Sequence, residues 1–181
     1  MELSLAKTFP MHSLRIKYEA SEGSMMIDLL TIRSLELNQN LQNPKSKDCL
    51  FGLLNQTLTP MGSRLLRSNI LQPLTDVGTL ENRYEALEEL TIKEEMFFGT
   101  RAALKPFLDL DKTLTALIVI PTQASLQYTE QALNNVIMLK QFLSSVNPVF
   151  EALAGARGPI LLEIQRLCAP VNVEPVQALI D

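Results

Sequence analysis

Hydrophobic residues recur at the spacing of α-helices along most of this chain. From Asp28 onward, leucine, isoleucine, valine and phenylalanine return every three or four positions, and prolines and glycines separate the runs. The pattern predicts helices over 28–37, 49–54, 59–72, 76–90, 93–108, 109–118, 125–145 and 160–167, with a polar loop at 38–48 and a turn-rich stretch at 169–175 leading into 176–180. No repeat of fixed period is present, which argues against a regular solenoid. We therefore expect a mainly α fold, an irregular multi-helix bundle.

Four of the expected helices have a clear starting residue. Thr59 precedes Pro60, so a hydroxyl oxygen can accept a bond from a first-turn amide, and the missing N–H of proline costs nothing at the first helical position. Asp28, Asp76 and Ser125 are the expected caps of three other helices. Three prolines are expected to end or interrupt helices: Pro73, Pro121 and Pro148.

The spacing also predicts which faces are buried. Leu66 and Ile70, four positions apart, share one face of their helix. In the next helix the expected buried positions are Leu80, Tyr84, Leu87 and Leu90, with glutamates on the other faces. In the longest helix they are Leu126, Leu133, Val136, Ile137 and Leu143.

The N-terminal region has a different pattern. Residues 14–18 alternate between apolar and basic side chains, which predicts a half-buried strand, and residues 25–27 are expected to return as its partner after a turn at 19–23. The expected fold therefore includes a short N-terminal β hairpin. Residues 1–12 are expected to be a linker.

Composition adds limits on function. The chain has 181 residues with a net charge of −4 and a pI near 5.1, which argues against a stand-alone nucleic-acid-binding domain. Cys49 and Cys168 cannot make a disulfide framework, so a reduced intracellular compartment is expected. No secretory signal is recognisable at the start, and the longest uncharged stretch is broken by Pro121, so no membrane-spanning helix is expected.

Candidate catalytic chemistry is sparse. Asp109 and Asp111 are two positions apart, which does not place them on one helix face, and one of them is expected to cap a helix. Pairs 88–89 and 94–95 are glutamates expected on solvated helix surface. His12 is expected to be exposed, and Cys49 to be a small core residue. The sequence contains neither of the common glycine-rich phosphate-binding motifs. We expect no catalytic, cofactor-binding or metal-binding residues here.

Basic residues offer one weak candidate for contact with DNA. Arg64 and Arg67 are three apart and could form a small positive ridge, with Arg15 and Lys17 nearby. The alternative, which the acidic net charge favours, is that these arginines pack against acidic helices or are simply exposed.

Several blocks of sequence, in order, resemble the lever (core) domain of MutS proteins. They are IDLLTIRSLEL at 27–37, LFGLLNQT at 50–57, TPMGSRLLR at 59–67, PLTD at 73–76, NRYEALEEL at 82–90 and DLDKTL at 109–114. A narrower resemblance, to meiotic members of the family, rests on SLRIKY at 13–18, RSNILQPL at 67–74, EEMFFG at 94–99 and IPTQ at 120–123.

The resemblance implies a domain division and a function. Residues 1–24 would be a linker and the end of the connector region, and residues 25–181 the first half of the lever domain, without the clamp and the ATPase. MutS proteins are dimeric DNA-clamp ATPases, so the resemblance implies ATP and Mg²⁺ for the full-length protein and none for this chain. It further implies a nuclear protein of meiotic recombination or mismatch-repair-like DNA recognition. Its partners would be a second meiotic MutS homologue and double-stranded or branched DNA, and no membrane.

An alternative from another class remains open. The chain could be a stand-alone helical protein-interaction domain that kept a MutS-like core without the ATPase. A phosphate-binding loop encoded beyond Asp181 would favour the lever segment, and a stop codon directly after it would favour the interaction domain.

Overall fold

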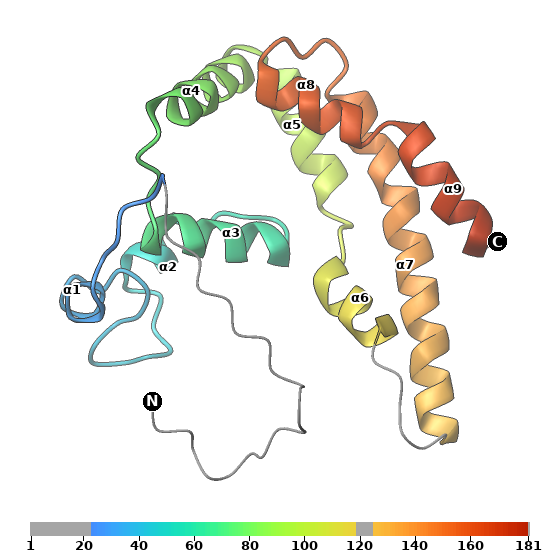
Figure 1. Cartoon of the computed structure of the whole chain (residues 1–181), viewed down its shortest axis with the longest axis horizontal. Coiled ribbons are helices and arrows are strands. Elements are labelled where there is room, and N and C mark those ends of the chain that lie inside the picture. Colours follow the sequence, from blue (N-terminus) through green and yellow to red (C-terminus); the bar gives the residue numbers. More distant parts are fainter. Residues whose placement is uncertain (1–22, 119–124, 181) are drawn as a thin grey trace.

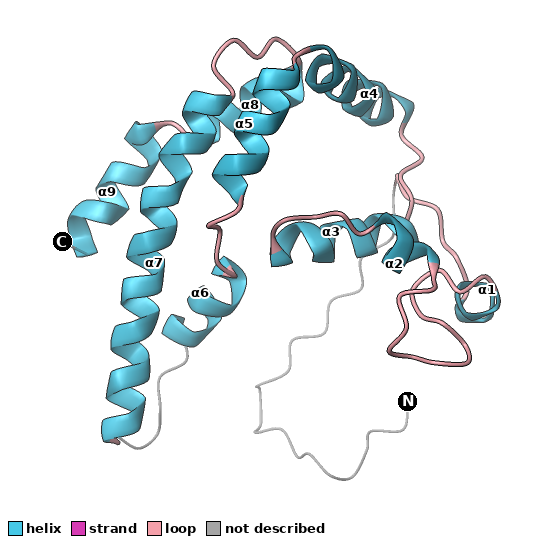
Figure 2. Cartoon of the chain, turned by 180° about the vertical axis from the view of Figure 1, so that it is seen from behind, coloured by secondary structure: helices cyan, strands magenta, loops and turns pink. Residues whose placement is uncertain are grey.

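The computed structural model describes residues 23–118 and 125–180, and within them the fold is helical (Figure 1). The helices in chain order are α1 (Leu29–Ser34), α2 (Leu50–Leu54), α3 (Pro60–Leu71), α4 (Val77–Ile92), α5 (Glu94–Leu104), α6 (Leu110–Ile118), α7 (Leu126–Ala152), α8 (Pro159–Leu167) and α9 (Pro170–Ile180). Helix α7 is the longest, and α5, α6 and α9 pack along it, whereas α1–α3 lie apart from it (Figures 1 and 2). The predicted mainly α, irregular architecture is confirmed for these residues.

The predicted β hairpin is not found. Its first strand, 14–18, lies outside the described residues, and the expected return strand at 25–27 has no strand structure. Instead, the amide of Met25 donates to the carbonyl of Pro73 at 2.7 Å, beside an isolated antiparallel bridge between Ser24 and Leu74. Residues 23–25 therefore pair with the connection between α3 and α4.

All four predicted N-terminal caps are confirmed. The side chains of Asp28, Thr59, Asp76 and Ser125 each accept a hydrogen bond from an amide in the first turn of α1, α3, α4 and α7. Pro60 stands at the first position of α3, as expected. Short polar side chains before apolar periodic runs thus set these helix starts.

The end of α1 departs from the prediction. Leu35 and Leu37 were expected on the helix, but Glu36 takes a left-handed backbone with φ of 48°. The amides of Glu36 and Leu37 donate to the carbonyls of Arg33 and Ile32, which is the bonding of a Schellman motif. The helix ends at Ser34 although glycine, the usual residue for this conformation, is absent.

Two prolines lie inside helices where breaks were expected. Helix α7 continues through Pro148 to Ala152, so its predicted end near Ser145 was wrong. Val146 and Val149 on either side of Pro148 are buried, and their packing offsets the lost backbone bond. Residues 170–180, expected to begin as turns, form α9 with Pro170 in its first turn and Pro175 inside it.

The core lies where four helices meet, not along the whole of α7. Ala86 of α4, Met96 of α5, Val149 of α7 and Leu161 of α8 are buried together with Leu153, which is 1% exposed. An edge-on contact between Phe107 and Phe142, with ring centres 5.0 Å apart, extends this packing along α7.

Because the core lies only where these four helices meet, the predicted buried faces were partly wrong. Leu66 and Ile70 are half-buried, as are Leu80, Leu90 and Leu143. By contrast, Leu126, Leu133, Val136 and Ile137 are exposed on the half of α7 that points away from the core, and Tyr84 and Leu87 are exposed on α4.

Candidate functional site

The first cluster of charged side chains joins α3 to α6. The guanidinium of Arg64 donates to both carboxylate oxygens of Asp109, at 2.9 and 2.7 Å, and to one oxygen of Asp111 at 2.6 Å. Paired donation to one carboxylate is the strongest geometry of an arginine ion pair. The N-terminal half of α3 points toward α6 in both cartoon views (Figures 1 and 2). We call these three residues the Arg64 triad.

The electrostatics of the Arg64 triad favour the charged forms of Arg64 and Asp109. The Arg64 guanidinium, and after it the backbone amide of Lys112, hold the pKa of Asp109 below its ordinary value. The two aspartates in turn raise the pKa of Arg64. The Asp109 side chain is only 15% exposed, whereas those of Arg64 and Asp111 are 46% and 66% exposed. The triad is therefore an ion cluster that is half open to water.

This arrangement corrects one prediction. Asp109 and Asp111 were expected to point apart because of helical spacing, yet both carboxylates reach Arg64. Asp109 precedes Leu110, the first residue of α6, so helical spacing does not apply to it. Its carboxylate also accepts from the first-turn amide of Lys112, in line with the predicted capping role.

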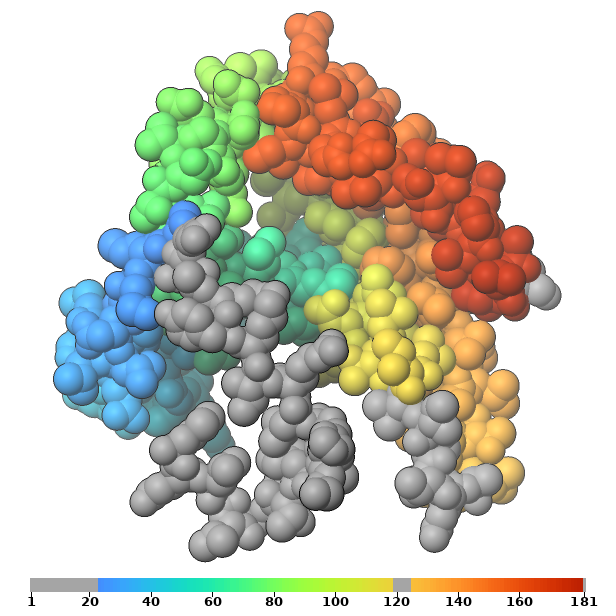
Figure 3. Space-filling view, viewed as in Figure 1, coloured from blue at the N-terminus to red at the C-terminus, as the bar shows by residue number. Residues whose placement is uncertain are grey.

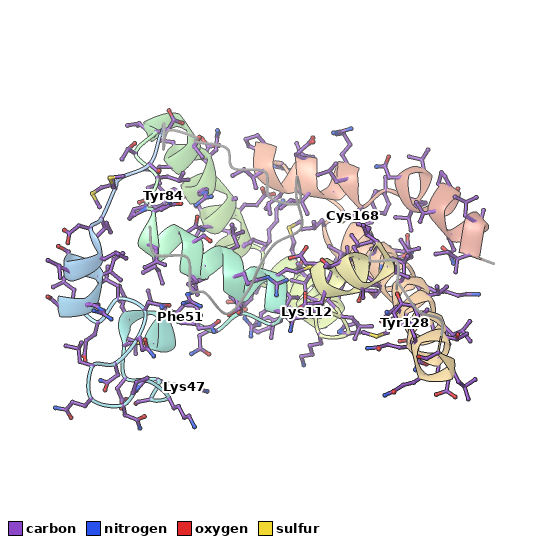
Figure 4. All side chains as sticks on the ribbon, turned by 60° about the horizontal axis from the view of Figure 1, so that its bottom comes forward. Lys47, Phe51, Tyr84, Lys112, Tyr128 and Cys168 are labelled. Atoms are coloured by element: carbon purple, nitrogen blue, oxygen red, sulfur yellow. The ribbon has the colours of Figure 1, made fainter. Side chains whose placement is uncertain are left out.

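A groove opens beside the Arg64 triad, with a volume of about 600 Å³. Its lining comes from α3, α6 and α7 and comprises Arg64, Asp111, Lys112, Thr115, Ala116, Tyr128, Gln131 and Asn135. Lys112 and Tyr128 come from the neighbouring helices α6 and α7 (Figure 4). The side chains around this groove are mostly polar and include neither cysteine nor histidine.

The second cluster joins α4 to the start of α8. The Glu89 carboxylate accepts from the ammonium of Lys93 at 2.7 Å and from the amides of Arg157 and Gly158 at 2.8 and 2.7 Å. Lys93 also donates to the carbonyl of Gly155 at 2.7 Å. The hydrogen bond from Lys93, followed by that from the Gly158 amide, lowers the pKa of Glu89. We call this arrangement the Glu89 joint.

The Glu89 joint fixes the backbone directly before α8. Gly158 precedes α8 and has no side chain to bond the first-turn amides, and the Glu89 carboxylate of α4 instead accepts from the backbone amides of Arg157 and Gly158. The sequence reasoning placed Glu89 on solvated surface, which was wrong, whereas Glu88, Glu94 and Glu95 are exposed as expected. Lys93, one turn after Glu89, is the sequence signal that could have identified the pair.

Arg64 and Arg67 do not form the positive ridge that was considered. The charge of Arg64 is directed at two carboxylates, while Arg67 is exposed and has no ion-pair partner among residues 23–118 and 125–180. Arg15 and Lys17 lie outside the described residues. A role of Arg64 or Arg67 in DNA binding stays a prediction.

Other chemistry is limited in the described part of the chain. No group of three or more His, Cys, Asp or Glu side chains there is arranged to hold a metal ion. Cys49 is half-buried and serves as a cap, its sulfur accepting from the amide of Gly52 at 3.3 Å, which was not foreseen. Burial raises the pKa of the Cys168 thiol. Among these residues, no helix is both long enough and apolar enough to span a membrane.

Comparison with known proteins places this chain in a family. The family model described as MutS domain III matches residues 30–174. The chain belongs to the MutS family. Over 149 residues it is 41% identical to the human protein named MutS protein homolog 4, covering 82% of this chain and 16% of the human protein.

Further relatives give the same picture. The MutS protein homolog 4 of Saccharomyces cerevisiae is 42% identical over 77% of this chain and 16% of its own length. The DNA mismatch repair protein MutS of Syntrophomonas wolfei is 31% identical over 97% of this chain and 19% of its own length. This MutS-family chain thus spans less than a quarter of these relatives. No solved structure matches it.

Proposed function

We propose that this chain is a lever segment of a MutS-type DNA-clamp ATPase acting in meiotic recombination. The family match and the similarity to proteins named MutS protein homolog 4 support this role. In the proposed whole protein, ATP and Mg²⁺ bind outside these residues, and the partners are a second meiotic MutS homologue and branched or double-stranded DNA in the nucleus. The segment itself is not an enzyme.

The Glu89 joint is the observation that best supports the mechanical role. A lever transmits displacement only if its helices cannot slide past one another, because slack absorbs the motion. Glu89 on α4 and Lys93 beside it make bonds across to residues 155–158, next to the buried Leu153 and Leu161. Helices α4, α5, α7 and α8 therefore move as one body.

The Arg64 triad gives a second support. Of the two DNA-contact candidates, Arg64 has its donors already directed at Asp109 and Asp111, whereas Arg67 is exposed without an ion-pair partner among the described residues. A phosphate would have to compete with two carboxylates for it. In the proposed role Arg64 couples α3 to α6 and does not bind DNA.

The test measures DNA binding by the purified chain. Fluorescence anisotropy with a four-way junction and a matched duplex, at about 50 and 200 mM salt, should show binding that is weak and lost at the higher salt. Arg64→Gln should leave the affinity unchanged. Tight DNA binding at about 200 mM salt would contradict the proposal that this segment is purely mechanical. A clear loss of DNA affinity in the Arg64→Gln variant would contradict it as well.

A second measurement separates the lever segment from a stand-alone interaction domain. Reading the transcript beyond Asp181 should reveal a phosphate-binding loop of the Gly-x-x-x-x-Gly-Lys-Ser/Thr type. A stop codon directly after Asp181 would contradict the lever proposal and favour the interaction domain.

A further inference from the structure

Helix α4 carries an exposed apolar stripe on the side opposite the core. Its members are Val77, Leu80, Tyr84 and Leu87, spaced three, four and three apart, the spacing of the contact seam of a coiled coil. Val77, Tyr84 and Leu87 are 65%, 66% and 61% exposed, and Leu80 is half-buried. We call this set the α4 stripe.

The packing of α4 explains why the stripe is free. Ala86 is buried against the core, and Glu89 and Leu90 face the same way, where α4 contacts α5 and α8. In the space-filling view, α4 (green) lies at the rim of the molecule (Figure 3), and Tyr84 is marked on it in Figure 4. Its outer face, about three turns long, is open to a partner.

Acidic side chains border one flank of the α4 stripe. Glu81 and Glu88 directly follow Leu80 and Leu87, the positions that flank a helix–helix seam, and Glu85 lies beside them. All three glutamates are exposed, and none has an ion-pair partner within the described residues. The opposite flank carries Arg83 alone. The stripe is therefore an apolar seam with a negative edge.

We propose that the α4 stripe docks an amphipathic helix of a partner protein whose apolar seam is flanked by lysine or arginine. The three unpaired glutamates select this partner, because basic side chains opposite them form ion pairs and acidic ones are repelled. The exposed stripe of α7, from Leu126 to Ile137, lacks such an edge, because Glu130 is the one charged residue in that range. Three turns of helix make a small interface, so the binding is reversible and salt-sensitive.

The test uses two synthetic helical peptides with the same leucine seam, one flanked by lysine and one by glutamate. Fluorescence anisotropy against the 181-residue chain should show the lysine peptide binding at least about tenfold more tightly at low salt, with the difference shrinking at high salt. The double variant Tyr84→Ser/Leu87→Ser should lose this binding. The matched control Leu133→Ser/Ile137→Ser, on α7, should keep it.

Charge reversal gives the sharpest outcome. In Glu81→Lys/Glu88→Lys the preference should invert, so that the glutamate peptide binds more tightly, while circular dichroism confirms an unchanged helix content. Equal binding of both peptides, or no effect of the Tyr84 and Leu87 substitutions, would overturn the proposal. So would sedimentation showing a dimer of the chain that the same substitutions dissolve, because the stripe would then belong to a second copy.

Discussion

The carboxylate of Glu89 accepts a 2.7 Å hydrogen bond from the amide of Gly158, although the two residues are 69 positions apart in the chain. This bond ties the middle of the described fold to its last third at one point. Gly158 has little room for a side chain, since an added Cβ would lie 3.0 Å from Glu89 Oε2 and 3.9 Å from Ala86 Cα. The close approach of α4 to the start of α8 depends on both residues.

Removing the Glu89 carboxylate should destabilise the fold. Glu89→Ala leaves two backbone amides and the Lys93 ammonium without this acceptor, and losing hydrogen bonds to a charged group costs about 1–3 kcal/mol. Urea unfolding followed by circular dichroism measures the loss. Glu88→Ala, on the exposed neighbour, is the matched control and should change stability by less than about 0.5 kcal/mol. Equal effects of the two variants would rule out the Glu89 joint as a stabilising contact.

The same residue should make stability depend on pH. The pKa of Glu89 is lower in the folded chain than its ordinary value of 4.5, so its stabilising effect is present above that value and disappears as the pH falls through the folded pKa. The stability difference between the natural chain and Glu89→Gln should therefore be largest near neutral pH and shrink in acid. Urea unfolding at about pH 7 and about pH 3 checks this. A difference that is the same at both pH values would contradict it.

A cavity at the helix junction should be costly. Leu153 is 1% exposed and lies in the core cluster, so Leu153→Ala should lower stability by about 2–5 kcal/mol. Leu162→Ala, at a side chain that is 44% exposed, should cost clearly less. Thermal melting compares the two. Similar losses would mean that the core is centred elsewhere.

Two glycine substitutions should act in opposite directions. Gly155 has φ of +86°, where an L-residue is strained, so Gly155→Ala should destabilise by about 1 kcal/mol, and Gly155→Asn by less. Gly78 lies in the first turn of α4 with only an ordinary contact near its added Cβ, so Gly78→Ala should stabilise by about 0.5–1 kcal/mol. Chemical unfolding curves distinguish the signs. Stabilisation by Gly155→Ala would show that this turn has another backbone conformation.

Replacing the proline inside α7 should stabilise the chain. Pro148→Ala restores an amide that can donate to the carbonyl of Ser144, and interior proline costs a helix about 3 kcal/mol relative to alanine. Pro159→Ala, at the first position of α8, should bring no comparable gain, because the missing amide costs nothing there. A lower melting temperature for Pro148→Ala would contradict a continuous α7.

Local signals in the sequence predicted local structure well. Thr59–Pro60, Asp28, Asp76 and Ser125 each mark a helix start because a capping bond involves residues two or three positions apart. The Schellman end of α1 was missed because Glu36, not glycine, takes the left-handed conformation. Periodicity also identified the apolar face of each helix. It did not indicate which of these faces are buried in the described fold.

The contacts of the Arg64 triad and of the Glu89 joint could not be predicted from the sequence. Arg64 and Asp109 are 45 positions apart, and Glu89 and Gly158 are 69 apart, so each contact depends on the packing of whole helices. Composition favoured acidic neighbours or simple exposure for Arg64, and its side chain is 46% exposed and bonds two aspartates. No sequence spacing indicated which carboxylates it would meet, or that Glu89 would bond the backbone just before a distant helix.

The uninterrupted course of α7 through Pro148 has a geometric consequence. Its 27 residues span about 40 Å at 1.5 Å per residue, and the buried residues Val146 and Val149 lie near one end. A tilt of about 10° about Val149 would move the Ser125 end by about 6 Å. If α7 had ended at Pro148, residues 126–147 could have rotated independently of the core. An angular change at α8 would then not have displaced the Ser125 end.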